Sequence, residues 1–219
     1  MQQKKNNIMI RSIAVFISII FLSGLVSAKP NEITVIDNEL FNAGPYDFVY
    51  GQPDAPVQIL EYFSLTCPHC ENFYSNVFSK LKEQYIDTGK VFWIKRSYIT
   101  DAASMSGTML LGCADKESRD AYLHILLVKQ SSWAYQRNFL ERLNSIAGLG
   151  GMSAIEFDSC MKNSKLEKDI RHVASEAKRV FKISGTPLFF MNQKRFDVYS
   201  YKSFAKQIDE LLLVKKDKN

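Results

Sequence analysis

The sequence contains few cysteines, 4 in 219 residues, and it lacks a second pair of closely spaced cysteines. Cys67 and Cys70 form the one close pair, whereas Cys113 and Cys160 stand alone. Structural zinc sites usually take four ligands, and a single C-x-x-C pair supplies only two of them. The pattern therefore disfavours a zinc-binding module, and we expect neither a metal nor another cofactor.

The sequence also lacks internal repeats, low-complexity tracts and a strong excess of one charge. Its 28 basic residues stand against 23 acidic ones, and three of the basic residues fall within residues 1–28. The rest of the chain is close to neutral, so its charge does not predict a nucleic-acid partner. A chain of this length can bury a good core as one domain, with room for an inserted subdomain.

Only one long apolar run is present, at residues 13–26. A basic head at residues 1–11 precedes it, and small residues end it at Ala28. This pattern is typical of a secretory signal peptide with cleavage after Ala28, and no cysteine lies near that point to carry a lipid. An uncleaved membrane anchor is the alternative, although the run is short for a membrane span. Export to an oxidising compartment would permit disulfides among all four cysteines.

The close cysteine pair lies in the segment Cys67-Pro68-His69-Cys70, which follows an apolar stretch at residues 57–65. That stretch is typical of a buried parallel strand, and the residues after the motif have helical spacing. Proline is favoured at the first position inside a helix, which makes Cys67 the helix cap. Two cysteines three positions apart share one face of a helical turn and can form a disulfide. The motif therefore predicts redox chemistry.

A thiolate at Cys67 would lie at the positive end of the helix dipole, facing free N–H groups of the first turn. His69 could add a hydrogen-bond donor or, when protonated, a positive charge. We therefore expect the pKa of Cys67 to lie well below that of a free cysteine, which would make the Cys67–Cys70 disulfide strongly oxidising. A purely structural disulfide is the alternative, but it would not need the inserted Pro68 and His69.

Glu61 is conspicuous within the apolar stretch. A carboxyl group in such a strand either lies on a face that reaches solvent or is buried near the cysteines, where it could carry protons. The sequence does not decide between these two interpretations.

A strand–helix–strand unit surrounds the motif. The helix after the motif ends near Gly89, and a strand at residues 91–99 follows it. Such a unit is a right-handed crossover with a parallel pair of strands, and it places reactive residues beyond the carboxyl end of the first strand.

The remaining segments are helical, apart from a turn-rich start and a hairpin near the end. The predicted elements are an edge strand at 33–36, helices within 101–181, strands at 185–191 and 196–199 joined by a turn at 192–195, and a final helix from Tyr201. Two capping boxes, Ser153 with Glu156 and Ser164 with Glu167, mark the starts of two helices in the long helical stretch.

Two segments together carry a resemblance to a known family. They are residues 61–73, Glu-Tyr-Phe-Ser-Leu-Thr-Cys-Pro-His-Cys-Glu-Asn-Phe, and residues 185–192, Gly-Thr-Pro-Leu-Phe-Phe-Met-Asn. With the helical insert between them, they resemble the DsbA-like thiol-disulfide oxidoreductases of the thioredoxin superfamily. The resemblance implies an α/β protein, a thioredoxin fold with an inserted helical domain. It divides the chain into a signal peptide (1–28), a lead-in (29–56), a first thioredoxin part (57–100), the insert (101–181) and a second thioredoxin part (182–219).

The resemblance also implies roles for individual residues. Cys67 is the attacking cysteine, Cys70 its resolving partner, and His69 the residue that tunes the pair. Glu61 becomes the buried acid, and Pro187 a cis proline beside the disulfide. Thr186 precedes that proline, where its backbone and hydroxyl could hold an incoming chain, while an ordinary trans bond at Pro187 is the alternative.

Two departures from the family pattern stand out. The turn at residues 192–195 lacks the glycine that many relatives carry, which leaves its turn type open. The second cysteine pair, Cys113 and Cys160, is similar to an additional disulfide found in an alphaproteobacterial subgroup. Both cysteines also suit the simpler role of small buried hydrophobic residues.

The function that the resemblance implies is donation of disulfides in the periplasm. The partners would be reduced exported proteins and a membrane oxidant of the DsbB type, and the protein would be a monomer. A disulfide isomerase or reductase would share the fold, although we find no dimerisation region in the sequence. A chaperone or binding module without redox turnover is the third alternative.

Overall fold

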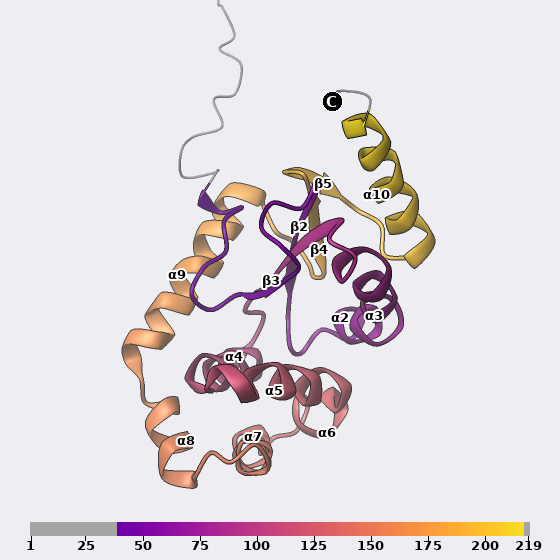
Figure 1. Ribbon diagram of the computed structural model, residues 1–219. Coiled ribbons are helices and arrows are strands. Elements are labelled where there is room, and N and C mark those ends of the chain that lie inside the picture. Colours follow the sequence, from indigo (N-terminus) through magenta and orange to yellow (C-terminus); the bar gives the residue numbers. More distant parts are fainter. Residues whose placement is uncertain (1–38, 217–219) are drawn as a thin grey trace, which may run out of the picture. The chain divides into compact units, whose positions relative to one another are not determined.

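In the computed structural model, residues 39–216 are described. The predicted signal peptide and the predicted edge strand at 33–36 lie outside these residues. Within them, five strands form one sheet in the order β1-β3-β2-β4-β5 (Figure 1). β2 and β3 are parallel, and the other neighbouring strands are antiparallel. The strands are β1 (Phe48–Tyr50), β2 (Val57–Phe63), β3 (Val91–Ser97), β4 (Leu188–Met191) and β5 (Lys194–Phe196).

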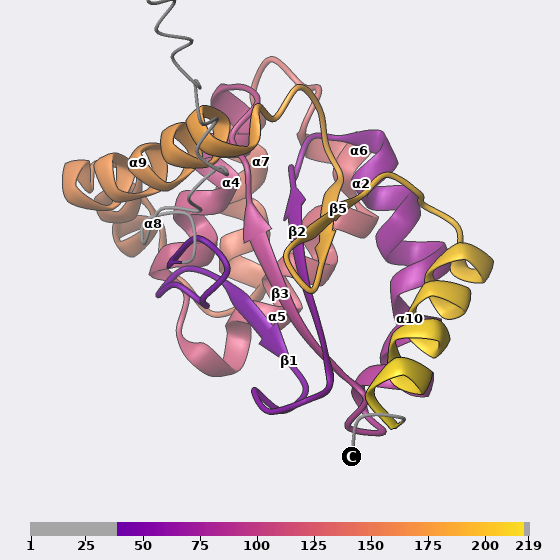
Figure 2. The ribbon, with the colours of Figure 1, turned by 90° about the horizontal axis from the view of Figure 1, so that it is seen from above.

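Helices cover both faces of the sheet because the central strands are apolar on both sides. Val57 and Ile59 of β2 pack in a core with the helices that follow the motif and with α10 (Tyr201–Lys216). Leu60 and Tyr62, which alternate with them, pack instead with Ala177 of α9 (Ser164–Phe181). Figure 2 shows α9 and α10 on opposite sides of the strands. The period of two along β2 therefore sorts its side chains between two separate cores.

The helix after the motif begins at Pro68 and runs without a break to Ile86. It consists of α2 (Pro68–Phe73), the π-helical turn η1 (Tyr74–Phe78), α3 (Ser79–Leu81) and a second π-helical turn, η2 (Lys82–Ile86). Gly89, at φ +73°, ends the connection to β3, in a backbone region that favours glycine. The predicted crossover unit is confirmed, with β2 and β3 in parallel register from Val57 opposite Val91.

Six helices lie between β3 and β4 and form the inserted helical region. They are α4 (Ala102–Cys113), α5 (Lys116–Val128), α6 (Gln130–Trp133), α7 (Phe139–Leu149), α8 (Ala154–Met161) and α9. Their core includes Leu123, Trp133 and Leu143, and it continues into Phe63 and Leu65 of the segment that leads to the motif. No described helix is long and apolar enough to cross a membrane.

The residues before β2 are held against the sheet by one buried arginine. Arg96 donates to both carboxylate oxygens of Asp47, to the carbonyl oxygens of Leu40 and Asn42, and to the Tyr62 hydroxyl. The side chains of Arg96 and Asp47 are 5% and 4% exposed. Because such a pair is stable only when its hydrogen bonds are complete, Arg96 fixes the path of this segment.

Three local sequence predictions need correction. The short edge strand β1 lies in a segment that we interpreted as turns; it exists because it pairs antiparallel with β3. Helix α9 is capped by Asn163, whose side chain accepts from the Leu166 N–H, so Ser164 is the first helical residue and not the cap. The capping box at Ser153 and Glu156 is confirmed.

The third correction concerns the hairpin. Its turn is only Asn192 and Gln193, with φ values of 46° and 65°, and β5 therefore begins at Lys194, earlier than predicted. Two central residues with positive φ match the twist of a hairpin, and asparagine tolerates this conformation without glycine.

Candidate active site

The motif lies where β2 ends and the helix begins, as its sequence predicts. Cys67 has extended backbone angles (φ −89°, ψ 118°) and occupies the cap position, with Pro68 at the first helical position. Both Cys67 and Cys70 are free thiols; Cys67 is partly exposed, whereas Cys70 is 1% exposed. Only the first of the two sulfur atoms is therefore open to a partner molecule.

The pKa of Cys67 is lowered from 9.0 to about 5. The largest cause is the hydrogen bond from the Cys70 thiol, followed by the Thr186 side chain and the backbone N–H groups of Cys70 and His69; partial burial opposes them. The N–H groups do not form a cap hydrogen bond with the Cys67 side chain, so the helix contributes as a field and not as a direct contact. His69 is exposed, and its contribution comes from its backbone.

The pKa of Cys70 is shifted in the opposite direction. Burial raises it first, and the hydrogen bond and negative charge of Cys67 raise it further. The Ser64 N–H donates to Cys70 Sγ at 3.4 Å, which lowers the pKa only in part. In the reduced pair, the negative charge therefore rests on the exposed sulfur and the proton on the buried one.

Thr186 and Pro187 border the exposed cysteine from the far end of the sequence. The peptide bond between them is cis. Cys67 Sγ lies 3.0 Å from the Thr186 carbonyl oxygen, to which it donates when it is protonated. Pro187 is buried immediately before β4, while Thr186 is partly exposed. The structure thus brings the two segments that carry the family resemblance into direct contact.

Of the two interpretations left open for Glu61, the structure has the buried acid, at 0% exposure. Its Oε2 accepts from Lys95 Nζ at 2.5 Å and from Trp93 Nε1 at 3.0 Å. Its Oε1 is buried and has no hydrogen-bond partner. Lys95 Nζ also lies 5.2 to 5.4 Å from the ring centroids of Phe63 and Tyr74, on the sheet face that the motif helix covers.

A network of hydroxyl groups, which the sequence did not reveal, holds the loop between β2 and Cys67. The Ser64 hydroxyl lies 2.7 Å from that of Thr100, and the Thr66 hydroxyl donates to Asp101 Oδ2 at 2.6 Å. Asp101 in turn caps α4 in a capping box with Ser104. The pattern Asp-x-x-Ser is a cap signal that the sequence could have supplied, but the contact with the loop is not readable from it.

The insert reaches the same loop at a second point. Gln130 and Tyr135 contact the backbone carbonyl groups of Leu65, Thr66 and Cys67. No periodicity or motif in a single sequence marks either residue, because the contact joins positions more than 60 residues apart.

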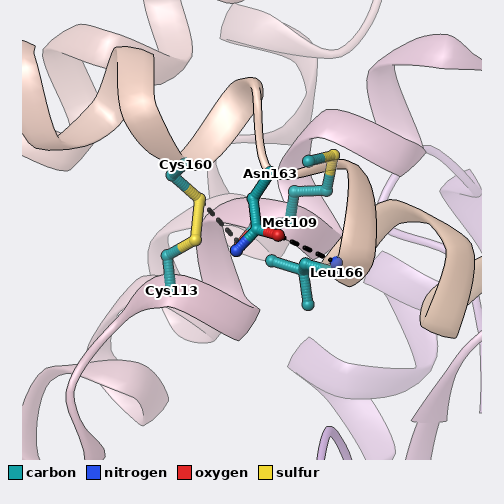
Figure 3. Close-up of a disulfide and its surroundings, with 5 residues drawn as sticks. All are labelled: Met109, Cys113, Cys160, Asn163 and Leu166. Atoms are coloured by element: carbon teal, nitrogen blue, oxygen red, sulfur yellow. Dashed lines mark hydrogen bonds between the residues drawn. A yellow bond between two sulfur atoms is a disulfide. The ribbon is translucent and has the colours of Figure 1, made fainter.

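The second cysteine pair lies in the insert and forms a disulfide. The bridge Cys113–Cys160 joins the end of α4 to the end of α8, with the two Cα atoms 6.1 Å apart (Figure 3). Figure 3 also shows Asn163, the cap of α9, beside the bridge. Cys160 is buried in a small core with Met105 and Ile170, so the bridge between α4 and α8 lies in a core to which α9 also contributes.

Within the described part of the chain, no group of three or more histidine, cysteine, aspartate or glutamate side chains is placed to hold a metal ion. The fold and the site are those of a thioredoxin, and a family model described as thioredoxin matches residues 43–210. The chain belongs to this family. Within it, the helical insert and the paired motifs make the chain a DsbA-like protein-disulfide oxidoreductase.

Proteins of similar sequence have names consistent with this class. A Rickettsia conorii protein has a name that describes it, by inference, as a protein-disulfide oxidoreductase. It is 32% identical to this chain over 179 residues, and the match covers 81% of this chain and 65% of the relative. A Rickettsia bellii protein with the same description is 31% identical, and the match covers 81% of this chain and 69% of that protein. The chain thus spans about two thirds of the length of these relatives.

Solved structures of similar fold are consistent with the same class of protein. The crystal structure of Wolbachia pipientis alpha-DsbA1 has a TM-score of 0.73 and 34% sequence identity, covering 80% of this chain and 94% of that one. Bacillus subtilis BdbD in its oxidised form has a TM-score of 0.63 at 21% identity, with coverage of 76% and 93%, and supports the fold.

Proposed function

We propose that this protein is an oxidant that donates the Cys67–Cys70 disulfide to newly exported proteins. The observation that carries the proposal is the opposite shift of the two thiol pKa values, down to about 5 at Cys67 and upward at Cys70. A pair whose reduced form holds a stable thiolate gives its disulfide readily to other thiols. The charge separation therefore favours an oxidant over a reductase.

The reaction follows from thiol–disulfide exchange. A substrate thiolate attacks Cys67 Sγ, the accessible sulfur of the pair; the Cys67–Cys70 bond breaks, and Cys70 leaves with the electron pair. Because the pKa of Cys70 is raised, this sulfur takes up a proton at neutral pH. A second substrate thiolate then attacks the substrate sulfur of the mixed disulfide, and Cys67 leaves as its stabilised thiolate. The substrate is oxidised, and the pair is reduced by two electrons.

We assign the transfer of the proton to Cys70 to the Glu61 carboxyl group. It is a buried carboxyl group on the sheet face beneath the motif helix, and one of its oxygen atoms has no partner. Such a group can hand a proton to the leaving Cys70 and recover it afterwards. Lys95 Nζ, 2.5 Å from Oε2, balances the charge of the carboxylate once Glu61 has given up its proton.

Thr186 and Pro187 are the residues that we assign to substrate binding. Pro187 has no N–H to donate to an incoming chain, whereas the partly exposed Thr186 lies 3.0 Å from the reactive sulfur through its carbonyl oxygen. An extended substrate segment could bind there by main-chain hydrogen bonds, which suits a donor that accepts many sequences. His69, exposed beside Cys67, is the residue that we assign to tuning the pair, and its backbone N–H is the group that acts on the Cys67 pKa.

The same proposal includes the cell biology expected from the sequence. The segment 1–28 supports export to the periplasm, and the family supports reduced protein substrates. Because donation leaves the pair reduced, turnover requires an external oxidant, for which a DsbB-type membrane protein is the candidate. We propose that the protein acts as a monomer.

The test is the equilibrium of the Cys67–Cys70 pair with glutathione at pH 7. An oxidant should have a reduction potential closer to about −120 mV than to about −270 mV. A value near the lower figure would contradict donation and favour the reductase.

A trapping experiment tests the assignment of the two sulfur atoms. Cys70→Ser should accumulate mixed disulfides with exported proteins through Cys67, whereas the matched Cys67→Ser should accumulate none. Equal trapping by both variants would contradict the assigned roles.

A further inference from the structure

We infer that Gln130 and Tyr135, here called the carbonyl clamp, are positioning residues through which the helical insert sets the acidity of Cys67. The inference deepens the proposed function and rests on it. Gln130 is 4% exposed, and its Nε2 donates to the Leu65 carbonyl at 2.8 Å and to the Cys67 carbonyl at 3.1 Å. Both amide hydrogens are therefore committed to the loop that carries the reactive cysteine.

Tyr135 completes the clamp at the Thr66 carbonyl, which lies between the two carbonyl groups that Gln130 binds. The residue is 55% exposed, but its hydroxyl oxygen lies 2.9 Å from the Thr66 carbonyl and 2.7 Å from Gln130 Oε1. A phenol has one proton, so this O–H serves two acceptor oxygens that face it together. The carbonyl groups of three consecutive residues, Leu65 to Cys67, thus all meet donors from one short stretch of the insert.

This stretch is held rigidly enough to act as a support. Helix α6 is a single turn, which is not stable on its own. Trp133 anchors it, being 0% exposed and donating from Nε1 to the Leu126 carbonyl at 2.8 Å. Gln130 is therefore presented to the loop by packed structure, as a residue with a positioning role requires.

The electrostatic effect follows from the direction of the peptide dipoles. A carbonyl oxygen carries partial negative charge, and three of them beside Cys67 would disfavour its thiolate. Donors on these oxygens offset that charge. The Cys67 carbonyl already accepts from the N–H groups of Cys70 and Glu71 at 3.0 and 3.2 Å, so the Gln130 bond also holds the cap geometry of Cys67.

Tyr135 responds to the charge that the clamp is inferred to stabilise. Its pKa is raised by partial burial and then by the negative charge of Cys67. The hydroxyl therefore lies close enough to Cys67 to respond to its charge, and it stays protonated and able to donate at neutral pH.

The test replaces each donor with a residue of similar size. Gln130→Met should raise the Cys67 pKa by about half a unit to one unit, followed by thiolate absorbance against pH. The glutathione equilibrium of the pair should shift about three- to tenfold toward the disulfide form, since one pKa unit corresponds to a factor of ten. Tyr135→Phe, which keeps the ring, should shift both quantities in the same direction by a smaller amount.

The matched control is Gln136→Met. Gln136 Nε2 lies in the same stretch, but it donates to the Ser131 carbonyl at 3.1 Å and not to a carbonyl of the motif loop. This variant should leave the pKa and the glutathione equilibrium unchanged. An unchanged pKa in folded Gln130→Met, or equal shifts in Gln130→Met and Gln136→Met, would overturn the inference. If Gln130→Met does not fold, Tyr135→Phe decides, and an unchanged titration there overturns it.

These measurements separate the inference from the proposed function. A reducing potential in the parent protein, together with a shifted Cys67 pKa in Gln130→Met, would remove the donor function and keep the clamp. An oxidising potential in the parent protein, together with a Cys67 pKa that is unchanged in both clamp variants, would keep the donor function and remove the clamp.

Discussion

Two neighbouring residues of β3, Lys95 and Arg96, each form a buried ion pair, on opposite faces of the sheet. Arg96 and Asp47 satisfy one another completely, since every N–H group of the guanidinium and both carboxylate oxygens have partners. The pair of Lys95 and Glu61 is incomplete, because Glu61 Oε1 is buried without a partner. Both pairs are almost entirely shielded from solvent.

The difference shows what each pair is suited to do. Arginine is a rigid fork that stays charged, so Arg96 is suited to fixing the chain before β2. Lysine with a single carboxylate oxygen leaves the second oxygen free to take or give a proton. The incomplete pair lies on the face that the motif helix covers, and the complete pair lies on the other face. The ion pair with the unpaired carboxylate oxygen, Lys95 and Glu61, is therefore the one that lies on the face of the redox site.

The largest expected effect comes from breaking the complete pair. Arg96→Met should destabilise the protein by about 3–5 kcal/mol, because it leaves Asp47 buried without its partner. Denaturant unfolding measures this loss. The matched control, Arg171→Met, removes an exposed pair with Glu167 and should cost less than about 1 kcal/mol. Equal losses in the two variants would remove the structural role of Arg96.

A smaller effect is expected from neutralising the incomplete pair, and it should appear in the reaction rate. Glu61→Gln cannot supply a proton to Cys70, so the oxidised protein should react with a small thiol about tenfold more slowly or worse at neutral pH. Stopped-flow kinetics over a range of pH checks this. Asp47→Asn is the comparison on the other face and should leave the rate unchanged; a normal rate in Glu61→Gln would refute the assigned proton transfer.

A further effect is a pH-dependent difference in stability between the oxidised and reduced forms. The Cys67 pKa falls from 9.0 to about 5 on folding of the reduced protein. The folded thiolate therefore stabilises the reduced form at high pH, and this advantage disappears as pH falls toward 5. Thermal unfolding of both forms from pH 4 to 8 should show the two curves converging at acid pH. Arg96→Met should lower both curves and leave their separation intact, and a constant separation in the parent would contradict the lowered pKa.

Much of the fold was predictable because local patterns and tertiary structure agree. The crossover around the motif, the helical insert and the hairpin all follow from periodicity and turn signals. β1 was missed because its three residues form a strand only through pairing with β3. Asn163 and Ser164 are adjacent residues that both cap helices well, so the true start of α9 depends on its packing.

The site was predictable only where its chemistry depends on residues that are close together in the sequence. Pro68 placed Cys67 at the helix cap, and the cap gave the direction of the pKa change. The largest cause of that change, the Cys70 thiol, acts through side-chain geometry that no spacing rule supplies. Lys95, Thr66 and Gln130 are ordinary polar residues in the sequence, and their roles arise from contacts made across 34 to 65 positions.

The long sequence separation between Cys67 and its neighbours has a consequence for biosynthesis. Thr186 lies 119 residues after Cys67, and the contact between them joins nearly the two ends of the described fold. While the chain emerges from its amino end, the motif appears early, but Thr186 is not yet present. During this interval Cys67 lacks its Thr186 neighbour, although Cys70 and the first helical turn, which also lower its pKa, have already been synthesised. The site therefore reaches its full geometry only when the last strands arrive, after the whole helical insert has been synthesised.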